Sequence, residues 1–153
     1  MEIKFKNIRF DPDTTPFHDL AKTMAKAFGY TAALDLDQKL AQLLRLRVAQ
    51  KNECAYCIIL HSKTAREIGI HEGKVDNISS YWNSELFDEK EKTALSYCDV
   101  LTVGTDKNFQ AYHDKLAQYY SIQEIAEIAA IIINMNVWTR LKLAQGETPY
   151  IEN

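Results

Sequence analysis

The amino-acid sequence predicts an all-α fold, a single-domain helical bundle of about six to seven helices. Apolar residues recur at helical spacing from residue 16 to residue 145, and capping patterns divide this stretch into separate helices. The 153 residues are the length of one ordinary domain, and no linker or low-complexity tract interrupts them. We therefore expect one domain over 1–153, with a helical core at 16–145 and terminal extensions at 1–15 and 146–153.

The first two predicted helices are bounded by residues that favour helix ends. Thr15 followed by Pro16 fits an N-cap with proline at the first helical position, and Gly29 fits the end of that helix. Either Asp35 or Asp37 is expected to cap the second helix, in which apolar residues lie three or four positions apart.

A third helix is predicted to begin near Asn52, as its N-cap, and to end at Gly69. Residues 71–81 indicate a short fourth helix. Asp88 has Glu91 three positions later, which is the spacing of a capping box, so a fifth helix is expected to begin there.

Two further helices complete the pattern. Residues 108–119 indicate the sixth, and Ser121 with Glu124 forms a second capping box at the start of the last. The last helix is apolar around most of its circumference, which places it in the middle of the bundle or at a subunit contact. We expect Trp138 to pack in the core or at that contact. Three residues of this helix are candidates to line a pocket or a subunit contact: Asn134, Trp138 and Arg140.

The bulk composition is that of a globular protein in water. It is 46% apolar and 25% charged, and the formal net charge of −3 lacks the basic excess of a nucleic-acid-binding protein. No apolar stretch reaches the roughly 18 residues of a membrane helix, and the N-terminus lacks the apolar core of a signal peptide. These features predict a cytoplasmic protein that binds neither nucleic acid nor membrane.

The chemistry is concentrated in KNECAYCIILH, residues 51–61, where two cysteines and a histidine are spaced three and then four apart. If Asn52 caps the helix, Cys54 lies in its first turn, Cys57 lies one turn later, and His61 projects from the same face. Unpaired N–H groups and the positive end of the helix dipole favour the thiolate there. Cys54, Cys57 and His61 are therefore the candidate redox residues.

These residues suggest a cycle that uses two thiols. One thiolate attacks a peroxide oxygen and becomes a sulfenic acid, and the second thiol condenses with it to an intramolecular disulfide. An external dithiol then restores the pair, while the histidine moves protons. Such a cycle needs no cofactor and no metal.

Other interpretations of the same residues stay open at this point. Cys54, Cys57 and His61 supply three ligands, which is enough for a catalytic zinc, although no second ligand pair accompanies them. The cysteines could instead be small buried residues, and His61 a core histidine with satisfied hydrogen bonds. A thioredoxin-like site would need a βαβ context, which the sequence does not show. Cys98 lies on an apolar helix face and is expected in the core.

The stretch LLRLRVAQKNECAYCIILHSKTAREIGI resembles the AhpD-like alkylhydroperoxidases of the carboxymuconolactone decarboxylase superfamily. It has their amphipathic helix, short polar turn, Cys-x-x-Cys, three residues and then histidine. The likeness continues more weakly through SSYWNSELFDEKEKTALSYCDVLT and IAEIAAIIINMNVWTRLKLA, so that it covers most of residues 16–145.

This resemblance implies an all-α fold, a homo-oligomer, and peroxidase or related dithiol activity without metal or flavin. It also implies that Cys57 attacks the peroxide, that Cys54 is the resolving partner, and that His61 belongs to a proton relay. Some relatives are reduced again by a lipoylated protein, which makes a lipoyl dithiol a candidate reductant.

The sequence departs from the family pattern at two positions. The relay of these relatives usually includes a glutamate twelve positions before the first cysteine, where this chain has Gln42. Gln42 completes the candidate catalytic set, because glutamine can orient His61 through a hydrogen bond, but it cannot accept a proton. Tyr56 stands where the best-studied relatives carry a second histidine. Glu53, beside the first cysteine, is a candidate substitute for the missing carboxylate.

Three functions follow from these observations. The first is a thiol-dependent peroxidase or disulfide reductase that acts on a small-molecule peroxide and is recycled by an external dithiol. The second is a decarboxylase-like lyase that acts on a cyclic lactone, a reaction that does not need two adjacent thiols. The third is a non-catalytic redox sensor, which the replacement of the relay glutamate by Gln42 keeps open.

Overall fold

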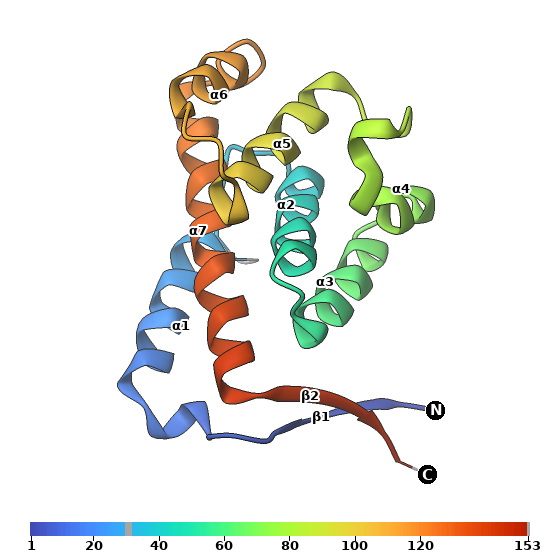
Figure 1. Cartoon of the computed structure of the whole chain (residues 1–153), viewed down its shortest axis with the longest axis vertical. Coiled ribbons are helices and arrows are strands. Elements are labelled where there is room, and N and C mark those ends of the chain that lie inside the picture. The colour runs from blue at the N-terminus through green and yellow to red at the C-terminus, as the bar shows by residue number, and fades with distance from the viewer. Residues whose placement is uncertain (30–31, 153) are drawn as a thin grey trace.

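The computed structural model describes residues 1–29 and 32–152 and confirms the all-α class (Figure 1). Within those residues there are seven α-helices, in agreement with the predicted six to seven. They are α1 (Pro16–Phe28), α2 (Gln38–Lys51), α3 (Ala55–Glu67), α4 (Glu72–Asn77), α5 (Glu89–Val103), α6 (Phe109–Leu116) and α7 (Ile122–Gln145). Two short 3-10 helices, η1 (Pro12–Thr14) and η2 (Ile78–Asn83), and two strands, β1 (Ile3–Asn7) and β2 (Glu147–Ile151), complete the fold.

Helix α2 is the centre of the bundle. It packs against α3, α5 and α7, and every residue from Leu40 to Ala49 is buried (Figure 1). A helix that is buried on all sides needs partners for any charge that it carries. Arg47 of α2 meets this need with two hydrogen bonds to the Asp99 carboxylate of α5, at 2.6 and 2.9 Å, and the Tyr81 hydroxyl donates to the same carboxylate at 3.0 Å. This network fixes α2 against α5 and η2.

Helix α7 joins two sides of the molecule. It packs against α2, α3 and α5 on one side and against α1 on the other, so it lies in the middle of the bundle as predicted (Figure 1). Its isoleucine-rich stretch is helical, because the flanking caps and the length of the apolar pattern outweigh the strand preference of β-branched residues.

Most helix starts agree with the predicted caps. Asp37 accepts from the Leu40 backbone N–H, and both capping boxes form, at Asp88 and at Ser121. Thr15 is the N-cap of α1, although its side chain makes no capping hydrogen bond. The predicted short helix at 71–81 is two elements, α4 and η2, and Ser80 within η2 departs from helical angles.

The predicted start of the third helix is wrong. Asn52 is the C-cap of α2, and its side chain donates to Asn136 at 2.9 Å and to Thr139 at 2.8 Å on α7. Glu53 then takes a left-handed conformation (φ 54°), so the chain turns and Cys54 becomes the N-cap of α3. The predicted Asn52 cap fails because Asn52 still has helical backbone angles at the end of α2 (φ −90°, ψ 0°), whereas an N-cap residue is extended.

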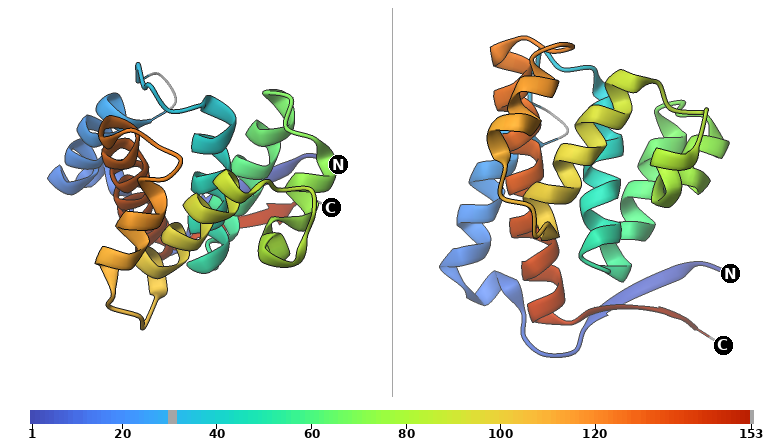
Figure 2. Two further views of the ribbon diagram at one scale, coloured as in Figure 1. Left: turned by 90° about the horizontal axis from the view of Figure 1, so that it is seen from above. Right: turned by 45° about the horizontal axis from the view of Figure 1, so that its top comes forward.

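The two terminal extensions pair with each other. β1 and β2 form an antiparallel ribbon in which Ile3 faces Ile151 and Asn7 faces Glu147. The ribbon passes beneath the ends of α3 and α7, and β2 contacts α3 (Figure 2). It therefore lies against the helix that carries both cysteines. In the described part of the chain, no helix has the length and hydropathy needed to cross a membrane.

Candidate active site

The two cysteines lie in contact at the start of α3. Cys54 has extended backbone angles (φ −85°, ψ 102°), and its carbonyl accepts the first helical hydrogen bond, from Ile58. Cys57 lies in the first turn, and the two sulfur atoms are 2.7 Å apart. Both are free thiols and are almost completely buried, at 1% and 2% exposure. The pair can therefore form a disulfide with very little movement of the backbone.

The contact makes the two thiols unequal. The hydrogen bond with Cys57 lowers the pKa of Cys54, and the Cys57 backbone N–H acts in the same direction against the opposing effect of burial. The same hydrogen bond, together with burial, raises the pKa of Cys57. In the singly ionised pair, Cys54 therefore carries the charge and Cys57 keeps the proton. The positive charge of Lys142 favours ionisation of both thiols, and Glu147 disfavours it.

His61 and Gln42 are joined by a hydrogen bond, as the sequence predicted. Gln42 Nε2 lies 3.2 Å from His61 Nδ1 and 2.9 Å from the His61 carbonyl oxygen. The carbonyl can only accept, so the nitrogen of the amide must face it, and the second N–H of that nitrogen points to Nδ1. Arg45 donates to Gln42 Oε1 at 3.4 Å, which fixes the same orientation of the amide from its other end.

This arrangement sets the protonation of His61. Because Nδ1 accepts a hydrogen bond, the neutral ring carries its proton on Nε2. Burial, together with the positive charge of Arg45, lowers the pKa of His61 from 6.5 to about 3. At neutral pH, His61 is therefore an uncharged imidazole whose Nε2 carries the proton and is not a base.

A cavity of about 390 Å³ opens beside these residues. Of the two cysteines, Cys57 lines it and Cys54 does not. The lining comes from four helices, α1, α2, α3 and α7, and from the C-cap of α1: Lys22, Ala25, Lys26, Gly29, Arg45, Tyr56, Cys57, Leu60, His61, Asn134, Met135, Trp138 and Lys142. Among the residues that the structure describes, this cavity combines a thiol, an imidazole, an apolar wall and several cations.

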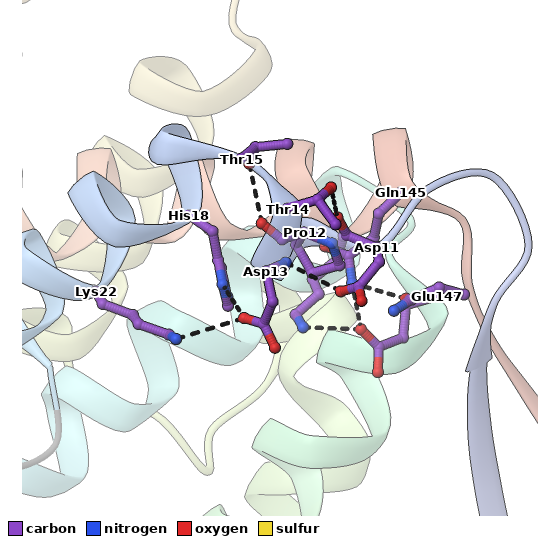
Figure 3. A network of polar contacts seen from close by, with 11 residues as sticks. Asp11, Pro12, Asp13, Thr14, Thr15, His18, Lys22, Gln145 and Glu147 are labelled. Atoms are coloured by element: carbon purple, nitrogen blue, oxygen red, sulfur yellow. Dashed lines mark hydrogen bonds and ion pairs between the residues drawn. The ribbon is translucent and has the colours of Figure 1, made fainter.

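Helix α7 forms one wall of the cavity. Asn134 and Trp138 line it, as the sequence analysis allowed, whereas Arg140 is exposed to solvent. The Trp138 ring borders the cavity and meets the ring of His18 at 5.7 Å, edge to face, and its packing at a subunit contact stays a prediction. His18 is held in turn by Asp13, at 2.8 Å (Figure 3).

The terminal ribbon supports the opposite side of the site. Tyr56 packs edge to face against Phe5 of β1, with 4.9 Å between ring centroids. The ammonium group of Lys142 lies 4.6 Å from the Tyr56 ring centroid and 2.8 Å from the Glu147 carboxylate of β2. Gln145 also donates to Glu147, at 2.6 Å (Figure 3). Sequence reasoning missed this layer, because its residues come from both ends of the chain.

The other candidate residues are not part of the cavity. Glu53 is exposed in its left-handed turn, so the suggestion that it replaces the relay carboxylate is not supported by its position. Cys98 is fully buried among apolar residues of the core, as predicted. Within the described residues, no three His, Cys, Asp or Glu side chains are grouped as metal ligands.

Residues 18–98 match the sequence profile of the carboxymuconolactone decarboxylase family. The match covers more than half of the chain, and the protein belongs to that family. Its fold is the AhpD-like fold of the family, which confirms the resemblance seen in the sequence.

One relative by sequence is YdfG of Bacillus subtilis (strain 168), an uncharacterized protein that is 27% identical over 127 residues. That match covers 82% of this chain and 86% of YdfG. Among solved structures, the fold is similar to Atu0492 of Agrobacterium tumefaciens, a protein of unknown function proposed to be the antioxidant defence protein AhpD. The TM-score is 0.83 at 22% identity, over 96% of this chain and 100% of that one.

A second solved structure is that of the debrominase Bmp8, whose Cys-to-Ala variant was crystallised in complex with 2,3,4-tribromopyrrole. Its TM-score is 0.71 at 24% identity, over 90% of this chain and 71% of that one. At these identities the structural likeness shows a shared fold. It also shows that enzymes occur among proteins with this fold.

Proposed function

We propose that this protein is a thiol-dependent peroxidase that reduces organic hydroperoxides with Cys57 and Cys54. The observation that carries the proposal is the order of the two thiols: Cys57 lines the cavity, and Cys54, which does not line it, lies 2.7 Å from the Cys57 sulfur. A substrate that enters the cavity meets one thiol, and the other is already within bonding distance for the second step.

The proposed reaction begins with the singly ionised pair. As Cys57 Sγ attacks the terminal oxygen of the hydroperoxide, its proton passes to the Cys54 thiolate. The S–O bond forms, the O–O bond breaks, and the alkoxide leaves, taking a proton from water to become the alcohol. His61 Nε2–H stabilises the leaving oxygen as a hydrogen-bond donor, a role that its lowered pKa and neutral tautomer suit.

Resolution and recycling complete the cycle. The Cys54 thiol attacks the sulfenic sulfur of Cys57, the S–S bond forms, and water leaves. An external dithiol then transfers two electrons and two protons to the disulfide and becomes oxidised itself. From the family resemblance we propose that the reductant is a lipoyl dithiol, either free or attached to a protein. We also propose that the protein forms a homo-oligomer and is located in the cytoplasm.

Mass spectrometry of the reduced protein tests the first half of this cycle. One equivalent of cumene hydroperoxide is expected to remove two hydrogens by linking Cys54 and Cys57. In Cys54→Ser, a sulfenic acid on Cys57 is expected to persist and to react with dimedone. Dimedone labelling of Cys54 in Cys57→Ser at an equal rate would contradict the order of the thiols.

Turnover separates an enzyme from a sensor. With dihydrolipoamide in excess, the proposed enzyme consumes many equivalents of cumene hydroperoxide. A redox sensor is oxidised once and consumes about one equivalent, an outcome that would leave the dithiol chemistry intact but would remove the peroxidase.

One observation favours a second candidate, a decarboxylase-like lyase that acts on a carboxylated lactone. Four cationic side chains line the cavity, and a carboxylate substrate would suit them: Lys22, Lys26, Arg45 and Lys142. This reaction does not use the thiols. The double variant Cys54→Ser/Cys57→Ser is therefore expected to retain lyase activity if the second candidate is correct, and to lose all peroxide reduction if the first is.

A further inference from the structure

The sulfur atom of Cys57 is almost closed off in this structure. Cys57 lines the cavity, yet it is only 2% exposed, and Cys54 is 1% exposed. Attack on any substrate requires the reacting atoms to come within about 3–3.5 Å of each other. A substrate therefore reaches the Cys57 sulfur only when part of the cavity wall moves away from it.

Helix α1 is the least firmly held of the four helices that form this wall. It contributes Lys22, Ala25 and Lys26 to the lining. Of the 13 residues of α1, only His18 and Ala21 are buried. Its main contacts are with α7 and η1, and it lies at the edge of the bundle, whereas α3 packs against α2, α4, α7 and β2 (Figure 1). An element with few buried residues separates from the rest of a protein at a low cost in free energy.

The chain before α1 is fixed to the end of α7. The backbone N–H of Arg9 donates to the Gln145 carbonyl at 3.1 Å, and its guanidinium donates to the Leu143 carbonyl at 2.8 Å. Pro12 of η1 is buried. Thr15, between η1 and α1, has extended backbone angles (φ −122°, ψ 135°). A change of these angles turns α1 relative to the fixed η1, so Thr15 is placed to act as a hinge.

One carboxylate crosses this hinge. Asp13 of η1 lies 2.8 Å from His18 Nδ1 and 3.5 Å from the Lys22 ammonium group, both on α1 (Figure 3). His18 is 9% exposed, and its ring meets that of Trp138 edge to face, with 5.7 Å between centroids. Lys22 and Trp138 both line the cavity. The two contacts of Asp13 therefore form a latch that holds α1 beside the α7 wall of the cavity.

We propose that α1 is a gate over Cys57, which turns at Thr15 and is held closed by the latch at Asp13. Opening breaks both contacts of Asp13 and, at the far end of α1, the hydrogen bond that Arg45 donates to the Phe28 carbonyl at 3.2 Å. The gate controls access to the sulfur whatever reaction the thiol performs. It is thus independent of the proposed function, and it is tested without a peroxide.

Alkylation of the reduced protein by iodoacetamide measures how often the gate is open, and peptide mass spectrometry reports each cysteine. Asp13→Ala is expected to increase the alkylation rate of the Cys54–Cys57 pair about two- to fivefold, because it removes a partly exposed ion pair. Cys98 is fully buried in the core and is the internal reference for global unfolding, so its rate is expected to stay the same. An unchanged rate at the pair, or an equal rise at Cys98, would overturn the gate.

Asp19→Ala is the matched control, because Asp19 is an exposed carboxylate in the first turn of the same helix and lies outside the latch. Its alkylation rate is expected to equal that of the unaltered protein. His18→Leu keeps a bulky side chain beside Trp138 but cannot bind Asp13, and it is expected to raise the rate. The double variant Asp13→Ala/His18→Leu is expected to be no faster than the faster single variant. Additive effects would show that Asp13 and His18 act separately, and would remove the latch.

The reverse experiment locks the gate with a water-soluble carbodiimide, which activates a carboxylate so that a neighbouring amine forms an amide. The carbodiimide takes up the water that is lost and becomes a urea. The Asp13 carboxylate and the Lys22 amine are 3.5 Å apart, close enough for this reaction. Protein that carries the Asp13–Lys22 amide is expected to be alkylated more slowly at the Cys54–Cys57 pair.

Lys22→Arg, treated in the same way, is the control for amides at other ion pairs, since it keeps the positive charge but offers no amine. The slowing is expected to be absent in this variant. Alkylation of the amide-linked protein at the original rate would show that the thiols are reached through another opening. Failure of the amide to form would show that Asp13 and Lys22 do not hold the gate together.

Discussion

The Gln42 amide donates a hydrogen bond to His61 Nδ1 over 3.2 Å, and this contact determines what the imidazole can do. A carboxylate at the same place would accept from Nδ1–H and leave Nε2 as a base. The amide has the opposite effect: it places the ring proton on Nε2. The identity of residue 42 on α2 therefore decides whether His61 Nε2 accepts a proton or donates a hydrogen bond.

Gln42→Glu is expected to raise the pKa of His61 above its present value of about 3, because a carboxylate beside the ring stabilises the imidazolium. It is also expected to increase the second-order rate of dithiol oxidation by cumene hydroperoxide by at least about tenfold, as His61 becomes a base for the Cys57 proton. Stopped-flow kinetics across pH 5–9 measures both effects.

Gln42→Met is the control for this experiment, since it keeps the buried volume and removes both hydrogen bonds. It is expected to slow oxidation rather than to accelerate it. An unchanged or lower rate in Gln42→Glu, with the fold intact by circular dichroism, would count against a relay through residue 42.

Acid is expected to destabilise the reduced protein through His61. The pKa of His61 is about 3 in the folded state and 6.5 in its ordinary range, so only the unfolded chain gains a proton between these values. The contribution of His61 to the free energy of unfolding is therefore completely present above pH 6.5 and is lost as the pH falls toward 3. The slope from this residue is up to about 1.4 kcal/mol per pH unit. Urea titrations at pH 7, 6 and 5 measure that slope.

The His61→Gln variant lacks the titrating imidazole. Its free energy of unfolding is therefore expected to change less between pH 7 and pH 5 than that of the unaltered protein. The carboxylates titrate mainly below this window and are common to both proteins. Equal slopes in the two proteins would show that the pKa of His61 is the same in the folded and the unfolded state.

Cys54→Ser is expected to slow the first oxidation step as well as to prevent resolution. The Cys54 thiolate accepts the Cys57 proton in the proposed reaction, and a serine hydroxyl cannot do so at neutral pH. Formation of the Cys57 sulfenic acid with one equivalent of hydroperoxide is expected to be roughly tenfold slower or more, as trapped by dimedone and quantified over time. An undiminished rate would show that Cys57 loses its proton by another route.

Local signals in the sequence predicted the fold class and most helix starts correctly. The caps at Asp37, Asp88 and Ser121 each accept a hydrogen bond from a backbone N–H in the first turn of their own helix. Both partners therefore lie within four consecutive residues, and the sequence of those residues is enough to predict the cap. The contact of Cys54 with Cys57 is local for the same reason, since three positions separate them.

The features that the sequence did not predict depend on distant residues. Asn52 is bound by Asn136 and Thr139 of α7, more than 80 positions away, and α3 begins after Cys54 rather than after Asn52. The ribbon pairs Ile3 with Ile151, and the cations of the cavity come from three helices. The spacing of apolar residues within one segment cannot predict such contacts, because they form only when distant segments pack together.

The ribbon is expected to tune the dithiol through the ion pair of Lys142 with Glu147. Lys142 lowers the pKa of Cys54, Glu147 raises it, and their charged groups are 2.8 Å apart. Glu147→Gln leaves the cation unopposed and is expected to lower the pKa of Cys54, whereas Lys142→Met is expected to raise it. Thiolate absorbance at 240 nm, followed through a pH titration of the reduced protein, measures these directions without requiring access to the buried sulfur.

The two variants are expected to change the rate of Cys57 oxidation at pH 7 in opposite directions, by about two- to fivefold each. Glu67→Gln, at the exposed far end of α3, is the control for a general change of charge. A shift of the titration in the same direction for both variants would mean that the ribbon acts through packing against Tyr56 and Phe5 rather than through charge. Opposite shifts would mean that the paired chain ends set the fraction of thiolate, and with it the rate of peroxide reduction.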